Sequence, residues 1–78
     1  MSNFSGKWTH GGTTTISISE KQKLLTVRLP NRPAATGFEV DLYAPTINVF
    51  FPDDAAFTGV LVGKNKILWS NDTTWIRE

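Results

Sequence analysis

Apolar and polar side chains alternate along nearly the whole chain, and this alternation constrains the fold more than any other feature. Ile16 and Ile18 alternate with serines and threonines, and Leu25, Val27 and Leu29 repeat the pattern after a polar turn. A period of two is typical of strands that bury one face, and no window of about eleven residues sustains the 3.6-residue period of an amphipathic helix. The pattern therefore predicts an all-β chain.

Turn-forming residues divide the alternation into short segments. The expected strands cover residues 7–10, 13–19, 24–29, 36–43, 46–51, 57–62, 66–69 and 73–77. Connections this short join antiparallel strands, because parallel strands need a long crossover. We predict one domain over residues 1–78, an antiparallel meander of about seven or eight strands that forms a small barrel or sandwich. Residues 1–5 are expected to be flexible.

Size and composition exclude several kinds of site. A chain of 78 residues can bury only one modest core. It has no cysteine, and His10 is its one histidine, so we predict no disulfide, no metal site of the usual Cys/His type and no cofactor. The net charge of +1 lacks the basic excess typical of nucleic-acid-binding domains. The chain shows neither a membrane-spanning apolar run nor a secretory signal, which favours a cytoplasmic location.

The end of the chain carries the most distinctive pattern. Residues 67–77 read ILWSNDTTWIR and resemble the closing hairpin, I-x-W-x-N-[GD]-T-x-W-x-R, of a family of small uncharacterised β-barrel domains. Those domains also open with G-x-W, as at residues 6–8, and have a T-G-x-L strand before the hairpin, as at residues 58–61. The resemblance implies a small barrel and no particular activity.

The opening G-x-W at residues 6–8 also resembles the first strand of lipocalin and avidin barrels. In lipocalins this tryptophan closes the floor of the barrel and a late arginine packs on it. The resemblance implies these roles for Trp8 and Arg77. Lipocalins are much longer chains, however, and an eight-stranded barrel of this size should be filled by its own side chains rather than by a large ligand.

The tryptophans of the last hairpin have two interpretations. A two-residue turn would place Trp69 and Trp75 on opposite faces, whereas a three-residue turn that pairs Ser70 with Thr74 would set the rings directly across from each other. We favour the second, and with it a structural clamp made of Trp8, Trp69, Trp75 and Arg77. The alternative is that some of these rings line a site, since tryptophan is also enriched at binding surfaces.

Aromatic rings beside amide and carboxylate groups suit the recognition of a sugar or a small hydrophobic molecule. The candidate ligand-binding residues are Trp8, Trp69, Asn71, Asp72 and Trp75. Four apolar residues fall on the outer faces of their strands and form a candidate surface for self-association: Leu24, Phe50, Leu68 and Ile76. The sequence thus predicts a non-catalytic binding or assembly module that forms a homo-oligomer.

Other functions are less well supported by the residues present. The alternation places Phe38 inside the barrel and Glu39 and Asp41 on a solvated outer face, although paired carboxylates could serve a glycosidase. His10 precedes two glycines and is expected to be an exposed loop residue, and Pro52-Asp53-Asp54 is typical of a turn rather than a calcium loop.

The alternative function is single-stranded nucleic-acid binding by a small barrel. The rings that could stack on bases are Phe50, Trp8 and Tyr43.

Overall fold

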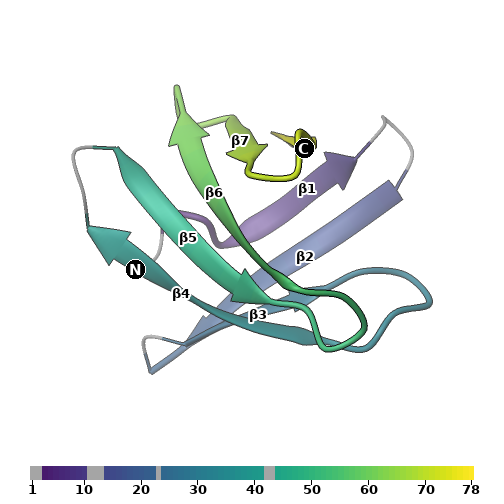
Figure 1. Ribbon diagram of the computed structural model, residues 1–78. Coiled ribbons are helices and arrows are strands. Elements are labelled where there is room, and N and C mark those ends of the chain that lie inside the picture. The colour runs from purple at the N-terminus through teal and green to yellow at the C-terminus, as the bar shows by residue number, and fades with distance from the viewer. Residues whose placement is uncertain (1–2, 11–13, 23, 42–43) are drawn as a thin grey trace.

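The computed structural model describes residues 3–10, 14–22, 24–41 and 44–78, so Tyr43 and the predicted strand ends at 13 and 42–43 lie outside the described residues. Eight antiparallel strands follow one another in sequence order, and the last pairs with the first to close a barrel (Figure 1). The strands are β1 (Gly6–His10), β2 (Thr14–Lys21), β3 (Leu24–Arg28), β4 (Ala35–Asp41), β5 (Pro45–Phe50), β6 (Ala56–Val62), β7 (Lys66–Trp69) and β8 (Thr74–Arg77). The predicted all-β antiparallel meander is confirmed. Within the described ranges, no helix has the length and apolar character needed to cross a membrane.

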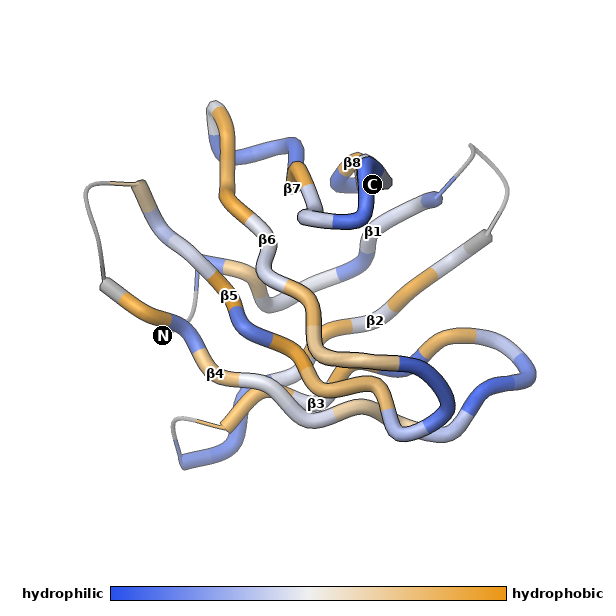
Figure 2. The backbone as a smooth tube through the Cα atoms, viewed as in Figure 1, coloured by the Kyte–Doolittle hydropathy of each residue, from blue (hydrophilic) through white to orange (hydrophobic). Residues whose placement is uncertain are grey.

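The interior of the barrel is filled by side chains from all eight strands. Along each strand every second residue points inward, and Figure 2 shows the resulting alternation of hydrophobic and hydrophilic positions, with a hydrophilic turn between β5 and β6. The buried apolar side chains form one cluster: Phe4, Trp8, Ile16, Ile18, Leu25, Val27, Ala35, Ile47, Val49, Phe51, Leu61, Ile67, Trp69 and Trp75. Packing of this cluster is the main source of stability in a chain without disulfides.

The inward and outward faces of β4 are the reverse of those predicted from the sequence. Gly37 pairs with Leu25 on one side and Val49 on the other, and both partners are buried. Paired residues share a face, so Gly37 points inward and Phe38 points outward, where its side chain is 53% exposed. A methyl group at Gly37 would lie 2.6 Å from the carbonyl oxygen of Asn48, so the barrel wall needs glycine there.

Residues 3–5 lie across one end of the barrel, which we call the covered end. Phe4 is fully buried, and its carbonyl oxygen accepts a hydrogen bond of 2.9 Å from the indole N–H of Trp8. The guanidinium of Arg77 stacks over the Trp8 ring at 4.3 Å and donates to the carbonyl oxygens of Asn3, Ser5 and Lys64. One arginine thus ties the N-terminal segment and the β6–β7 turn to the last strand.

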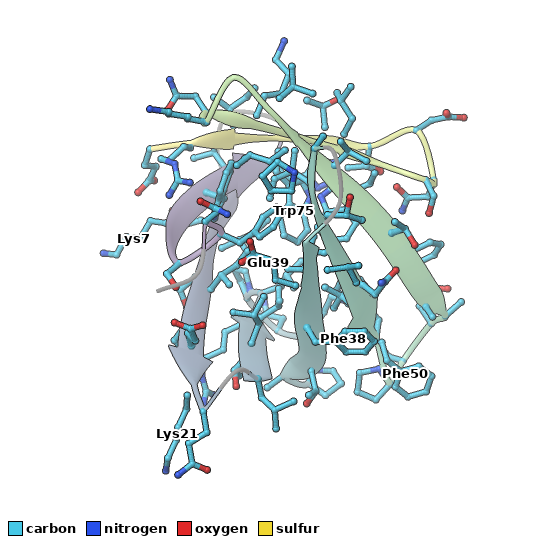
Figure 3. The ribbon with its side chains drawn as sticks, turned by 90° about the vertical axis from the view of Figure 1, so that its left-hand side faces the viewer. Lys7, Lys21, Phe38, Glu39, Phe50 and Trp75 are labelled. Atoms are coloured by element: carbon cyan, nitrogen blue, oxygen red, sulfur yellow. The ribbon has the colours of Figure 1, made fainter. Side chains whose placement is uncertain are left out.

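Glu39 also faces the covered end rather than an outer solvated surface, as its position two residues after Gly37 requires. Its carboxylate accepts hydrogen bonds from the backbone N–H of Asn3 at 3.1 Å and from the Asn3 side-chain amide at 2.6 Å. The predicted outward placement of Glu39 is wrong for the same reason as that of Phe38. Figure 3 shows Glu39 within the barrel outline and Lys7 and Lys21 projecting away from it.

Candidate functional site

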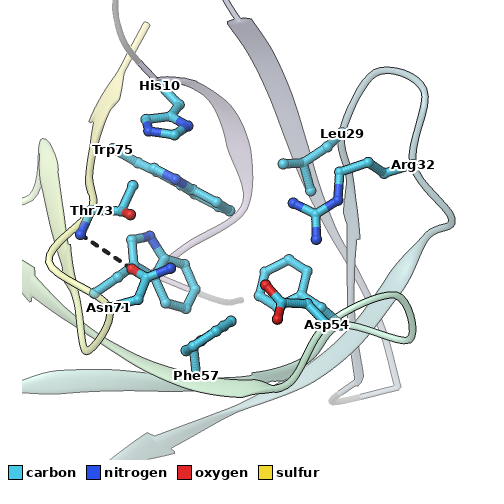
Figure 4. Close-up of a pocket in the computed structure, with 10 residues that line it drawn as sticks. His10, Leu29, Arg32, Asp54, Phe57, Asn71, Thr73 and Trp75 are labelled. Carbon is cyan, nitrogen blue, oxygen red and sulfur yellow. Dashed lines mark hydrogen bonds between the residues drawn. The ribbon is translucent and has the colours of Figure 1, made fainter.

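The opposite end of the barrel holds the candidate site, which we call the open end. The end of β1 and the turns after β3, β5 and β7 meet there around a pocket of about 60 Å³. Figure 4 shows His10, Thr73 and Trp75 on one side of this pocket and Leu29, Arg32 and Asp54 across from them. The complete lining is His10, Leu29, Arg32, Phe51, Asp54, Phe57, Trp69, Asn71, Thr73 and Trp75.

Four aromatic rings in contact form the apolar part of the pocket. The ring centres of Trp69 and Trp75 are 4.6 Å apart, and Phe51 lies 5.8 Å from Phe57 and 6.3 Å from Trp69. All of these pairs are tilted or edge-on, which is the geometry that aromatic quadrupoles favour. Phe57 is only partly buried, so its ring is the most accessible of the four.

The turn between β7 and β8 differs from both pairings considered for it. Trp69 pairs with Thr73, because its N–H donates to the Thr73 carbonyl at 2.9 Å, and the three residues 70–72 form the turn between them. Ile67 stands opposite Trp75, so Trp69 and Trp75 contact each other diagonally on the inner face rather than directly. Asp72 has a φ of 67°, and this left-handed residue completes the three-residue turn.

The Asn71 side chain fixes this turn from within. Its amide oxygen accepts a hydrogen bond of 3.2 Å from the Thr73 N–H, as the dashed line in Figure 4 marks. An asparagine that bonds to the backbone two residues on is a common turn device. Asn71 therefore holds the rim of the pocket in place and lines the pocket at the same time.

An ion pair spans the other side of the open end. Arg32 donates to both carboxylate oxygens of Asp53 at 2.8 Å, and its guanidinium lies 5.2 Å from the centre of the Phe51 ring. The hydrogen bonds from Arg32 lower the pKa of the Asp53 carboxyl, and they raise the pKa of Arg32. Both side chains are about one-third exposed, so the pair positions the β3–β4 and β5–β6 turns more than it stabilises the fold.

The indole N–H of Trp69 is the unusual group of this site. The Trp69 side chain lines the pocket and is 94% buried, and its Nε1 atom has no hydrogen-bond acceptor among the described residues. Trp8 provides the contrast, because its Nε1 is equally buried and donates to the Phe4 carbonyl. A buried donor without an acceptor costs on the order of 1–3 kcal/mol, so its occurrence at a pocket calls for an explanation.

The structure brings together three of the five candidate ligand-binding residues. Trp69, Asn71 and Trp75 line the pocket, whereas Trp8 is fully buried at the covered end beneath Arg77. Asp72 is exposed and borders a separate shallow hollow beside the last turn. His10 is exposed, and it lines the rim because it ends β1 opposite Trp75.

The four candidate interface residues are exposed but fall into two groups. Leu25 pairs with Gly37, which places Leu24 beside Phe38, and Phe50 follows on the next strand. We call Leu24, Phe38 and Phe50 the outer patch; their side chains are 53%, 53% and 61% exposed. Leu68 and Ile76 lie on β7 and β8, and the hydrogen-bonded pair of Asn48 and Thr58 separates them from the outer patch.

Sequence reasoning missed seven of the ten residues that line the pocket: His10, Leu29, Arg32, Phe51, Asp54, Phe57 and Thr73. A usable signal was present, because a closed meander places every second turn at the same end. The turns after β3 and β5 must therefore join the turn that contains Asn71. The sequence prediction left open whether the sheet closes into a barrel, and it is this closure that brings the turns together around one pocket.

No family model, curated protein or solved structure matches this chain.

Proposed function

We propose that this chain is a non-catalytic binding module and that its ligand enters the open end of the barrel. The observation that carries the proposal is the buried indole N–H of Trp69, which has no acceptor among the described residues and belongs to a side chain that lines a pocket of aromatic, amide and charged groups. A few polar groups among apolar ones are typical of small-molecule sites. The pocket of about 60 Å³ holds a few water molecules, so only one small group of a ligand would enter it.

Two of the carboxylates have structural partners. Glu39 binds Asn3 at the covered end, and Asp53 binds Arg32 on the rim. In the described ranges no three histidine, cysteine or acidic side chains gather in a way that could hold a metal ion. Glu39 and Asp53 are thus held in structural contacts, whereas the Asp54 carboxylate lines the pocket, where we propose that it accepts hydrogen bonds from a ligand.

A fragment screen followed by two-dimensional NMR tests this proposal. We expect the signals that shift to come from the rim, especially from Asn71, Thr73 and the indole of Trp69. The indole of Trp8 is an internal control, because it is hydrogen-bonded at the covered end. Fragments that bind only elsewhere, or none that bind at all, would refute the proposed site.

We also propose that the chain self-associates through the outer patch. A shallow groove of about 210 Å³ runs between Phe38 and Phe50, with Asn48 and Thr58 among its lining residues, and Figure 3 shows both rings at one rim of the barrel. In a two-fold dimer, a ring of each copy can fill the groove of the other, because such an interface uses the same surface twice. A second copy of this chain is therefore the occupant that we favour.

Sedimentation over a wide concentration range tests the self-association. We expect the unaltered chain to form dimers and Phe38→Ser or Phe50→Ser to shift the equilibrium toward monomers. Leu68→Ser is the matched control, because Leu68 is an exposed apolar residue outside the outer patch. A chain that stays monomeric throughout, or dimers that persist in both phenylalanine variants, would contradict this interface.

A further inference from the structure

The hydrogen-bonding needs of the pocket indicate which chemical class of ligand it takes, an inference that rests on the proposed function. The Trp69 N–H can only donate, so the inserted group must offer an acceptor oxygen or nitrogen. A purely hydrocarbon group would leave this buried donor unpaired, and binding would then carry the full cost of its desolvation. Small hydrophobic molecules are thus disfavoured.

The charges around the pocket disfavour an anion. Arg32, the one cationic side chain in the lining apart from any charge on His10, is engaged by both oxygens of Asp53. Asp54 adds a second negative charge on the same rim and lines the pocket directly. A carboxylate or phosphate would therefore meet two carboxylates against a single paired guanidinium. A neutral ligand avoids this repulsion and can donate its own hydrogen bonds to Asp54.

The shape of the open end adds the third constraint. Figure 4 shows Trp75 together with His10, Asn71 and Thr73 on one side and Leu29 together with Arg32 and Asp54 on the other, so both sides of the pocket mix apolar and polar groups. A ligand that fits this mixed lining carries C–H groups and hydroxyl groups close together. With about 60 Å³ of space, one edge of a ring or one hydroxymethyl group can enter, while the rest stays outside.

We infer that the open end binds a neutral saccharide, which inserts a hydroxyl-bearing edge of one sugar unit toward Trp69. An oxygen of the inserted group accepts the hydrogen bond of the Trp69 indole. Hydroxyl groups at the rim donate to the Asp54 carboxylate. They also donate to the Asn71 amide oxygen, whose second lone pair is left free by its bond from the Thr73 N–H. The accessible ring of Phe57 borders the sugar's C–H groups.

Titration with defined probes, followed through the indole N–H signals of the three tryptophans, tests this inference. The saccharide probes are glucose, galactose, mannose and N-acetylglucosamine, each also as a linear trisaccharide. Tetramethylammonium, butanoate and cyclohexanol represent the cationic, anionic and apolar classes. We expect at least one saccharide to shift the Trp69 indole saturably while the Trp8 indole stays unchanged.

Two variants sharpen the test without relying on the core. Asp54→Asn should weaken the saccharide by about tenfold, because a hydrogen bond to a charged group is lost. Asp72→Asn, on an exposed side chain outside the pocket, should leave the affinity unchanged. Trp69→Phe serves only to assign the indole signal, which it removes; its near-ultraviolet spectrum reports whether the variant is still folded.

The outcomes separate this inference from the proposed function. If a non-saccharide probe shifts the Trp69 indole and no saccharide does, the open end is a binding site for another class, and the saccharide inference is wrong. If neither these probes nor the fragment screen affects the open end, both proposals fail. Saccharide binding that Asp54→Asn leaves untouched, or that shifts the Trp8 indole instead, would also overturn the inference.

Discussion

Arg77 and Trp8 face each other across the seam where the last strand pairs with the first. They are register partners in the β1–β8 ladder, and the guanidinium carbon lies 4.3 Å from the centre of the indole ring. The same guanidinium donates to three backbone carbonyl oxygens from two other segments. The Arg77 side chain therefore links the strand pairing that closes the barrel to the segment that covers its end, in a chain that has no disulfide.

Replacing Arg77 by lysine should destabilise the fold although the charge is kept. An ammonium group cannot reproduce the planar fork that reaches Asn3, Ser5 and Lys64 while it stacks on an indole. We expect the free energy of unfolding to fall by about 2–4 kcal/mol, measured by urea denaturation. Arg28→Lys, on the exposed face of β3, is the control and should cost little. Equal stability of the two variants would contradict this role of Arg77.

Adding a methyl group at Gly59, on strand β6 beside β7, should disturb the packing of Trp69 at the open end. Gly59 pairs with Trp69, and a Cβ atom there would lie 2.6 Å from Cγ2 of Ile67 and 3.1 Å from the Trp69 ring. Gly59→Ala should therefore lower the free energy of unfolding by about 1–3 kcal/mol and alter the tryptophan emission.

Gly63→Ala provides the comparison for this variant. No atom lies within 4 Å of a Cβ at Gly63, but its φ is 62°, so the cost there is backbone strain of about 1 kcal/mol. Its emission should match that of the unaltered chain. An emission change in this variant, or none in Gly59→Ala, would show that contact with Trp69 is not the cause.

The alternation of side chains was sufficient to predict the strands, their order and the all-β class, because each turn carries its own local signal. It failed on β4, where Phe38 and Val40 gave a stronger apolar pattern than Ala35 and Gly37. The small residues nevertheless face inward, because the register with β3 and β5 decides the face and the narrow barrel leaves no room for a ring. The register between strands depends on the tertiary structure, so it cannot be predicted from the alternation within a single strand.

The candidate site was only partly predictable for a related reason. Trp69, Asn71 and Trp75 belong to one hairpin, so their proximity follows from the local sequence. Arg32 and Asp54 reach the pocket only because closure of the barrel brings three hairpin turns to one end. The Trp69 N–H lacks an acceptor among the described residues because of the exact packing of its neighbours, and no sequence pattern reports that packing.

The pair of Arg32 and Asp53 should give the open end a pH dependence at acid pH. Because the hydrogen bonds from Arg32 lower the pKa of Asp53 in the folded state, their contribution is fully present above the unfolded pKa of about 3.9. It is lost as the pH falls through the lowered value. An NMR titration of the Asp53 carboxyl should show this lowered pKa, and Arg32→Gln should move it back toward the ordinary value. A pKa that is the same in both chains would contradict the role of Arg32.

Asp72 should tolerate glycine far better than alanine, because its backbone decides the geometry of the last turn. Its φ of 67° lies in the left-handed region, which costs other L-residues about 1–2 kcal/mol but glycine almost nothing. We expect Asp72→Gly to leave the free energy of unfolding nearly unchanged and Asp72→Ala to lower it by about 1 kcal/mol, measured by thermal denaturation. Thr74→Ala, at an exposed position within β8, controls for the loss of a polar side chain near the turn. Asp72 reaches the left-handed region, and with it the three-residue turn that brings Trp69 against Trp75. If alanine proved as stable as glycine, the diagonal contact of the two rings would have to be maintained by packing alone.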